Sequence, residues 1–127
     1  VDTSALVAIL RKEPEGDVFL ELINDADICR ISAATLLESV IVIDNRVSVA
    51  AGRELDLLIF RAGIVIEPVT EAQVAIARQA YLAFGRGNHP ASLNFGNCFA
   101  YALSMDRGEP LLFKGNDFSQ TDVRPAL

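Results

Sequence analysis

Carboxylates and hydroxyl groups stand where predicted strands end or helices begin. Asp2 comes just before an apolar run that predicts a helix to about residue 11, and Thr3 and Ser4 follow it directly. Open α/β sheets bind ligands in the crevice outside the carboxyl ends of their strands, so Asp2 is a candidate for chemistry. The alternative is that Asp2 only caps the helix or lies in a frayed terminus.

Two further acidic residues occupy comparable places. Glu38 interrupts a helix, predicted over 33–46, that is apolar almost all round. We therefore expect its carboxylate to be partly buried and to need a partner, although a salt-bridged or surface role stays open. Asp117 follows a short buried strand predicted at 111–113 and has the same relation to a strand end as Asp2.

Asn97 lies in the first turn of a helix predicted from about residue 93. Gly96 precedes it, and a glycine permits close backbone approach, while the N-terminus of a helix favours anions nearby. This turn is therefore suited to a neighbouring negative charge.

Three other polar side chains carry weaker signals. His89, in the loop 85–90, is expected to be solvated or hydrogen-bonded rather than a metal ligand or general base. Arg86 could meet a phosphate, but an isolated surface arginine usually does nothing specific. Asp122 is expected to be solvated or to cap a turn, and a metal role is the less favoured alternative.

The elements that must position these residues alternate between helix and strand. The apolar spacing predicts helices over 3–11, 15–24, 33–46, 50–62, 71–84 and from 93, and strands at 27–32, 63–69 and 111–113, with an edge strand at 121–123. This order predicts an α/β fold with a doubly wound, mainly parallel sheet and helices on both faces. Leu57 and Phe60 fall off the apolar stripe of helix 50–62. We favour a broader core stripe for them over a partner surface.

The composition fits one compact domain spanning residues 1–127, because 51% of the residues are hydrophobic. No apolar run of about 18 residues and no basic leader are visible, so we expect no membrane span, no signal peptide and a cytoplasmic location.

Cys29 and Cys98 lie in apolar segments and are expected to stay reduced. The net charge of −6 argues against a generally basic nucleic-acid surface but not against a local one. Carboxylates clustered around a cation would contribute to such a balance.

Four blocks of the sequence carry a family resemblance. They are DTSAL at 2–6, ISAATLLE at 31–38, LNFGNCFAYA at 93–102 and LLFKGNDF at 111–118. In this order they resemble the successive blocks of PIN-domain ribonucleases, and most of all the VapC toxins of bacterial VapBC toxin–antitoxin pairs. The resemblance implies a PIN-like fold, Mg²⁺- or Mn²⁺-dependent endonucleolytic cleavage of RNA such as tRNA or an rRNA loop, a homodimer, and inhibition by a bound VapB antitoxin.

The resemblance also implies roles for single residues. Thr3 or Ser4 takes the place of a polar residue that supports the site. The catalytic and metal-binding positions fall on Asp2, Glu38, Asn97 and Asp117. Asn97 departs from the family pattern, which has Asp there.

The chemistry explains why this departure matters. Phosphodiester hydrolysis needs a nucleophilic water and a stabilised leaving oxygen, and hard oxygen ligands around divalent cations supply both. Asn97 keeps a carbonyl oxygen but lacks one negative charge, and neighbouring unit charges about 4 Å apart interact by about 4 kcal/mol at an effective dielectric of 20. One hypothesis is a VapC-like endoribonuclease that is inactivated, naturally or by engineering, at position 97. The alternative is a non-catalytic PIN-fold module that binds antitoxin or RNA.

Overall fold

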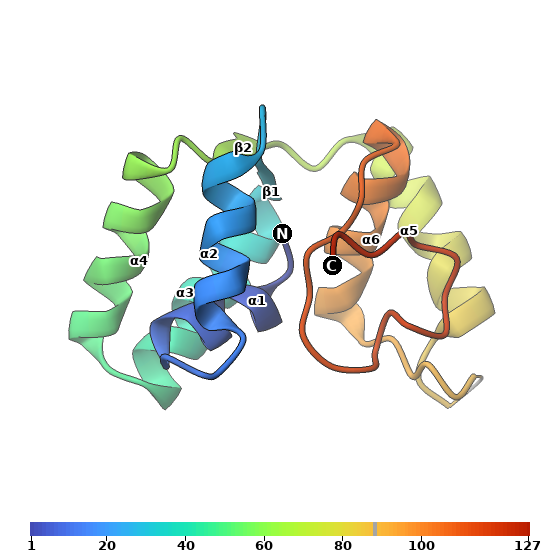
Figure 1. Ribbon diagram of the computed structural model, residues 1–127. Coiled ribbons are helices and arrows are strands. Elements are labelled where there is room, and N and C mark those ends of the chain that lie inside the picture. The colour runs from blue at the N-terminus through green and yellow to red at the C-terminus, as the bar shows by residue number, and fades with distance from the viewer. Residues whose placement is uncertain (88) are drawn as a thin grey trace.

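The computed structural model describes residues 1–87 and 89–127, so residue 88 of the expected loop 85–90 lies outside the described residues. Two short strands separate three pairs of helices along the chain (Figure 1). The order is α1 (Thr3–Leu10), α2 (Gly16–Asp25), β1 (Arg30–Ser32), α3 (Ala33–Arg46), α4 (Val49–Arg61), β2 (Val65–Glu67), α5 (Glu71–Phe84) and α6 (Phe95–Arg107). The helices agree with the sequence-based prediction to within a few residues.

Small polar side chains fix where most of these helices begin. The N-cap side chains of Ser32, Ser48 and Thr70 accept backbone N–H groups at the starts of α3, α4 and α5. Each of these caps satisfies a donor that has no partner within its own helix. Local sequence therefore sets these boundaries.

The strands β1 and β2 pair in parallel, with Arg30 opposite Val65 and Ser32 opposite Glu67. This confirms the predicted α/β class and the parallel arrangement. Both strands are shorter than the predicted ranges 27–32 and 63–69. An apolar pattern reports burial, whereas a strand also needs paired backbone groups.

The start of the chain and the segment 111–112 extend this layer. The backbone nitrogen of Val1 donates to the carbonyl of Arg30 at 3.0 Å, and the backbone N–H of Asp2 donates to the carbonyl of Leu112 at 2.9 Å. Residues 1–2 therefore lie between β1 and the segment 111–112. The backbone of Asp2 is therefore fixed next to Leu112, independently of the contacts of its side chain.

The predicted edge strand at 121–123 is wrong, because the pairing falls a few residues later. Leu111 forms an isolated parallel bridge with Pro125. The backbone N–H of Thr121 instead turns back to the carbonyl of Phe118 at 3.0 Å. The predicted strand at 111–113 is likewise reduced to this single bridge.

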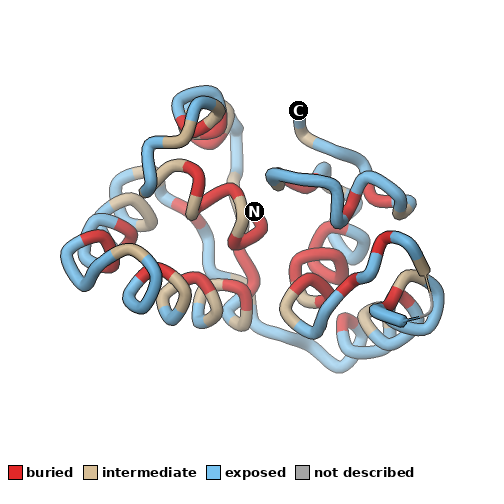
Figure 2. The backbone as a smooth tube through the Cα atoms, turned by 90° about the horizontal axis from the view of Figure 1, so that it is seen from below, coloured by how far each residue is buried: buried red, intermediate tan, exposed pale blue. Residues whose placement is uncertain are grey.

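The buried side chains form two separate cores. Exposed residues 68–70 carry the chain from one core to the other (Figure 2). The first core comprises Ala5, Leu6, Ala8, Phe19, Ile23, Ile31, Ile43, Ala51, Leu55, Ile64 and Leu112. The second core comprises Ala80, Leu93, Ala100, Tyr101, Leu111, Phe118 and Val123. Helix α3 of the first core contacts α6 of the second, and Glu38 of α3 lies against the first turn of α6 at this boundary.

One expectation about the core is wrong. Leu57 is exposed and Phe60 is 84% exposed, so neither belongs to a broader core stripe on α4. Helical spacing locates an apolar face but cannot show how wide a face the rest of the fold covers. Within the described residues, no helix is long and apolar enough to cross a membrane.

Candidate active site

Asp2 is a buried carboxylate with one satisfied and one unsatisfied oxygen. It is the N-cap of α1, and its Oδ2 accepts the backbone N–H of Ser4 at 3.0 Å and the Ser4 hydroxyl at 2.7 Å. Its Oδ1 is buried and has no hydrogen-bond partner among the described residues, and the residue is 3% exposed. Burial raises the pKa of Asp2, the Ser4 hydrogen bonds oppose that rise, and the nearby Glu38 adds to it. Asp2 therefore caps α1 with one oxygen and is a candidate site residue through the other.

Ser4 connects Asp2 to the segment that follows the 111–112 pairing. Its hydroxyl donates to Asp2 and accepts the backbone N–H of Lys114 at 3.0 Å. The Lys114 side chain forms ion pairs with Glu13 and, at 2.5 Å, with Glu15. Ser4 thus holds Oδ2 of Asp2 at the start of α1, and Oδ1 is the oxygen of Asp2 that has no partner among the described residues.

Glu38 is half-buried and has a defined partner, as the sequence predicts. The hydroxyl of Thr3, a residue only 8% exposed, donates to Glu38 Oε1 at 2.6 Å. Ser39 Oγ lies 3.0 Å from the same Thr3 oxygen. The other carboxylate oxygen of Glu38 lies against Gly96, in the first turn of α6. Glu38 therefore touches both α1 and α6.

Asn97 takes part in a reciprocal cap at the start of α6. Its Oδ1 accepts the backbone N–H of Asn94 at 3.1 Å, and Asn94 Oδ1 accepts the backbone N–H of Asn97 at 2.9 Å. An N–H group donates only to the oxygen end of an amide, so this cap fixes which way the Asn97 amide points. Its carbonyl oxygen is engaged, and its Nδ2 donates to none of the described groups.

Asp117 is exposed and makes no hydrogen bond or ion pair with the described residues. Asp122 is also exposed, as expected, but it accepts a 2.5 Å hydrogen bond from the Tyr101 hydroxyl that the sequence analysis did not anticipate. Burial, together with that bond, raises the pKa of Tyr101. Asp122 therefore ties the C-terminal tail to α6.

The predicted four-residue site is only partly assembled. Asp2 interacts electrostatically with Glu38, and Glu38 reaches the turn that carries Asn97, whereas Asp117 stays apart. Across residues 1–87 and 89–127, no three His, Cys, Asp or Glu side chains lie close enough together to hold a metal ion. The unpartnered Oδ1 of Asp2 nevertheless suits a cation, because a buried carboxylate oxygen without a partner is costly. Asp2 and Glu38 are the two carboxylates that would hold a divalent cation here, and Asn97 does not add a third carboxylate.

The weaker candidates fall where the sequence analysis expects. His89 Nδ1 accepts the backbone N–H of Ala91 at 3.0 Å, and its ring packs edge-on against Phe84. Cys29 and Cys98 are free thiols. The contact between Gly96 and Glu38 is not predicted from the sequence, although a glycine in the first turn of a helix is a signal for a close approach.

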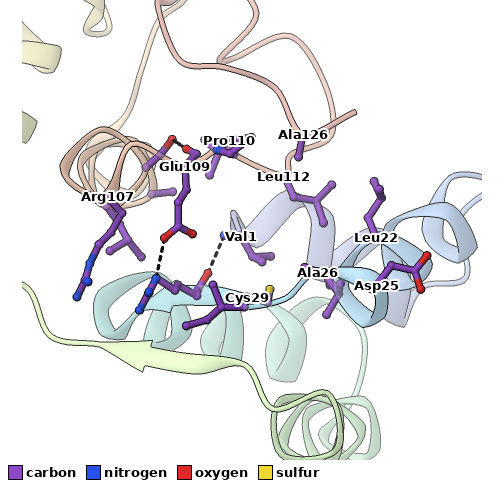
Figure 3. Close-up of a pocket in the computed structure, with 17 residues that line it drawn as sticks. Val1, Leu22, Asp25, Ala26, Cys29, Arg107, Glu109, Pro110, Leu112 and Ala126 are labelled. Carbon is purple, nitrogen blue, oxygen red and sulfur yellow. Dashed lines mark hydrogen bonds and ion pairs between the residues drawn. The ribbon is translucent and has the colours of Figure 1, made fainter.

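A cavity of about 350 Å³ lies beside Val1, Cys29, Glu109 and Leu112 (Figure 3). Of its charged lining residues, Arg30 pairs with Glu109 at 2.8 Å, and both Arg30 and Arg107 pair with Glu67, which lies outside the lining, at 2.6 Å and 2.9 Å. None of the four candidate residues lines this cavity. It is therefore separate from the candidate active site.

The family model for the PIN domain matches residues 1–124, which include the parallel strands and all four candidate residues, Asp2, Glu38, Asn97 and Asp117. The chain is 53% identical to ribonuclease VapC28 of Mycobacterium tuberculosis, over all of this chain and 96% of the relative. It is 46% identical to ribonuclease VapC of Mycolicibacterium smegmatis, over 97% of this chain and 95% of the relative. The chain belongs to the VapC ribonucleases of the PIN-domain family.

A solved structure supports the fold independently. The crystal structure of Mycobacterium tuberculosis VapC20, described as a sarcin–ricin loop cleaving toxin, is similar with a TM-score of 0.73. The match covers 98% of this chain and 97% of that one at 18% identity. At this identity the likeness shows a shared PIN fold.

Proposed function

We propose that this chain is a metal-dependent endoribonuclease toxin of the VapC type that is inactivated by Asn97. The main support for this proposal is the buried Oδ1 of Asp2, which has no partner among the described residues and lies near a second carboxylate, Glu38. Mg²⁺ or Mn²⁺ suits such hard oxygen ligands and would offset the cost of burying them.

The residues of the chain prepare this place for a cation. Ser4 holds one oxygen of Asp2, and Thr3 holds one oxygen of Glu38, so the second oxygen of each carboxylate has no hydrogen-bond partner among the described residues. We propose Asp117 as a third acidic ligand on the family resemblance alone, because its side chain is exposed and lies apart from Asp2 and Glu38. When bound, the cation supplies an activated water and neutralises charge at the cleaved phosphodiester.

Asn97 is the reason we propose that the enzyme is inactive. Its carbonyl oxygen already serves the backbone of Asn94, and an amide adds no negative charge. We expect a cation to bind more weakly here than beside a carboxylate.

The deciding experiment compares cleavage of purified cellular RNA by this protein and by Asn97→Asp, with Mg²⁺, Mn²⁺ or EDTA. We expect only the Asp variant to cut at a discrete site and EDTA to stop it. The double variant Asp2→Asn/Asn97→Asp keeps the helix cap and is expected to lose the activity. No cleavage by Asn97→Asp under any condition would refute the proposal.

We propose structured RNA of the cytoplasm, tRNA or an rRNA loop, as the substrate class. The description of VapC20 as a sarcin–ricin loop cleaving toxin supports the rRNA choice. Sequencing the new ends of the cleaved RNA would distinguish a tRNA from an rRNA target.

The second candidate is a non-catalytic module that binds a VapB antitoxin or RNA, and Asn97 favours it. Both candidates include a VapB partner, for which the exposed Leu57 and Phe60 on α4 offer an apolar surface. Co-purification with a VapB chain and loss of binding in Phe60→Ser would support this assignment. Binding without cleavage by Asn97→Asp would favour the module over the enzyme.

A homodimer is also part of the proposal. Helices α5 and α6 form an apolar groove of about 460 Å³ lined by Val74, Tyr81 and Phe95, and Phe95 is 78% exposed. Burying such a patch against a second copy is favourable. Light scattering on the protein and on Phe95→Ser tests this, with a dimer expected only for the former.

A further inference from the structure

We propose that Gly96 is a positioning residue for Glu38, because its missing side chain leaves the space that the Glu38 carboxylate occupies. This inference rests on the proposed function, since it assigns Gly96 a part in the same site. It also explains why a glycine stands at the start of α6, where alanine would be the better helix former.

The contact leaves no room for a side chain. A Cβ built on Gly96 would lie 1.7 Å from Glu38 Oε2, 2.6 Å from Cδ and 3.0 Å from Oε1. Atoms that are not bonded do not approach to 1.7 Å, so any residue other than glycine displaces the carboxylate or pushes α6 away. Gly96 lies within helix α6, so a left-handed backbone is not the reason for a glycine here.

Glu38 is held from the opposite side as well. Thr3 donates to Glu38 Oε1 at 2.6 Å, and the buried Ser39 lies beside the Thr3 hydroxyl. The carboxylate therefore lies between a hydroxyl of α1 and the first turn of α6. The partial positive charge at the N-terminus of α6 favours a carboxylate at this point.

Gly52 offers a matched control. A Cβ on Gly52 would lie 2.0 Å from Asp44 Oδ1, so the local clash is of the same kind. Asp44, however, is exposed and makes no hydrogen bond with the described residues, so its side chain can rotate into water. Gly52→Ala should therefore be tolerated.

The test places Gly96→Ala and Gly52→Ala separately in the Asn97→Asp protein. Without metal, the carboxyl carbon of Glu38 and the backbone amide of Thr3 are followed by NMR, and only Gly96→Ala should shift both. Mn²⁺ binding by calorimetry should be about tenfold weaker or more in Gly96→Ala, as is typical when a residue that orients a ligand is changed. Gly52→Ala should match the parent.

A second pair of variants covers the case in which Gly96→Ala does not fold. Thr3→Val keeps the shape but loses the hydroxyl that holds Glu38, and Thr3→Ser keeps the hydroxyl. We expect Mn²⁺ binding to weaken in Thr3→Val and to be restored in Thr3→Ser. Equal Mn²⁺ affinity in Gly96→Ala and the parent, or in Thr3→Val and Thr3→Ser, would overturn the inference.

The two proposals fail in different ways. If Asn97→Asp neither binds Mn²⁺ nor cuts RNA, the proposed function is wrong, and the metal-free NMR comparison still decides whether Gly96 positions Glu38. If Asn97→Asp binds and cuts but Gly96→Ala leaves the NMR signals of Glu38 unchanged, only the role of Gly96 is wrong.

Discussion

The backbone N–H of Asn94 donates to Oδ1 of Asn97, and the backbone N–H of Asn97 donates to Oδ1 of Asn94. This capping box uses only the oxygen of each amide. A carboxylate at position 97 has two oxygens, so one can keep the cap while the other faces the site. The cap therefore tolerates either residue at position 97, and the extra negative charge of Asp changes only the candidate active site.

The first prediction concerns the stability of Asn97→Asp. In EDTA, we expect its free energy of unfolding to fall by on the order of 1–2 kcal/mol, because a new negative charge joins Asp2 and Glu38 at an effective dielectric of about 20. Saturating Mn²⁺ should reverse the loss, with about 2.7 kcal/mol gained at a concentration 100 times the dissociation constant. Thermal unfolding with and without Mn²⁺ measures both effects.

Asn24→Asp is the matched control, since it makes the same charge change at an exposed position of α2. Its stability should not depend on Mn²⁺. An equal response of the two variants would show that the effect belongs to net charge and not to the site.

The second prediction concerns pH and Asp2→Asn. Burial raises the pKa of Asp2 above its ordinary value of 3.8. The stability contribution of a carboxyl with a raised native pKa is complete below the unfolded value and is lost as the pH rises through the native value. The metal-free parent should therefore lose stability relative to Asp2→Asn as the pH rises above about 4, by about 1.4 kcal/mol per unit of pKa shift.

Asn is as good an N-cap as Asp, so Asp2→Asn should keep α1 intact. Denaturant unfolding in EDTA from acid to neutral pH gives the difference between the two proteins. A difference that stays constant over this range would contradict the prediction.

The third prediction concerns Ser4→Ala. The change removes a donor to Asp2 and the acceptor of the Lys114 backbone N–H, so we expect a loss of about 1–2 kcal/mol in unfolding free energy. The pKa of Asp2 should rise further, because the Ser4 hydroxyl lowers it. Urea unfolding measures the first effect and carboxyl NMR the second. Ser119→Ala removes an exposed hydroxyl and should stay within about 0.5 kcal/mol of the parent.

The fourth prediction concerns the tail. Tyr101→Phe removes the bond to Asp122 from a side chain in the second core, and we expect it to cost about 1 kcal/mol, or roughly 4 °C in Tm for a domain of this size. Tyr81→Phe is the control, because Tyr81 is exposed and its hydroxyl has no partner among the described residues. Calorimetry that finds equal Tm values for the two variants would show that the bond does not stabilise the tail.

Much of the fold can be read from the sequence because its signals are local. Helical spacing and residues such as Ser32 and Thr70, which cap helices through neighbouring N–H groups, lie within one turn of the boundaries they set. The strand lengths cannot be read in this way, since pairing depends on a second segment far along the chain. The exposure of Phe60 likewise depends on what the rest of the fold leaves uncovered.

The same limit applies to the candidate site. The partial burial of Glu38 follows from its apolar helix, but its partners Thr3 and Gly96 are distant in sequence and meet it only in the folded chain. The Asn94–Asn97 cap is a local signal, yet its usual sequence form pairs Ser or Thr with Glu or Gln, so two asparagines conceal it. The loop that carries Asp117 follows neither a helical nor a strand pattern.

The two separate cores divide the candidate residues evenly. Asp2 and Glu38 precede the exposed crossing at 68–70, and Asn97 and Asp117 follow it. A chain cut at this crossing leaves two fragments, neither of which holds a complete set. The second fragment also carries Leu112 and Ala126, which pack against the first core, so apolar contacts would favour association of the two fragments. A toxic nuclease built on this plan could be produced as two inert polypeptides and assembled by mixing.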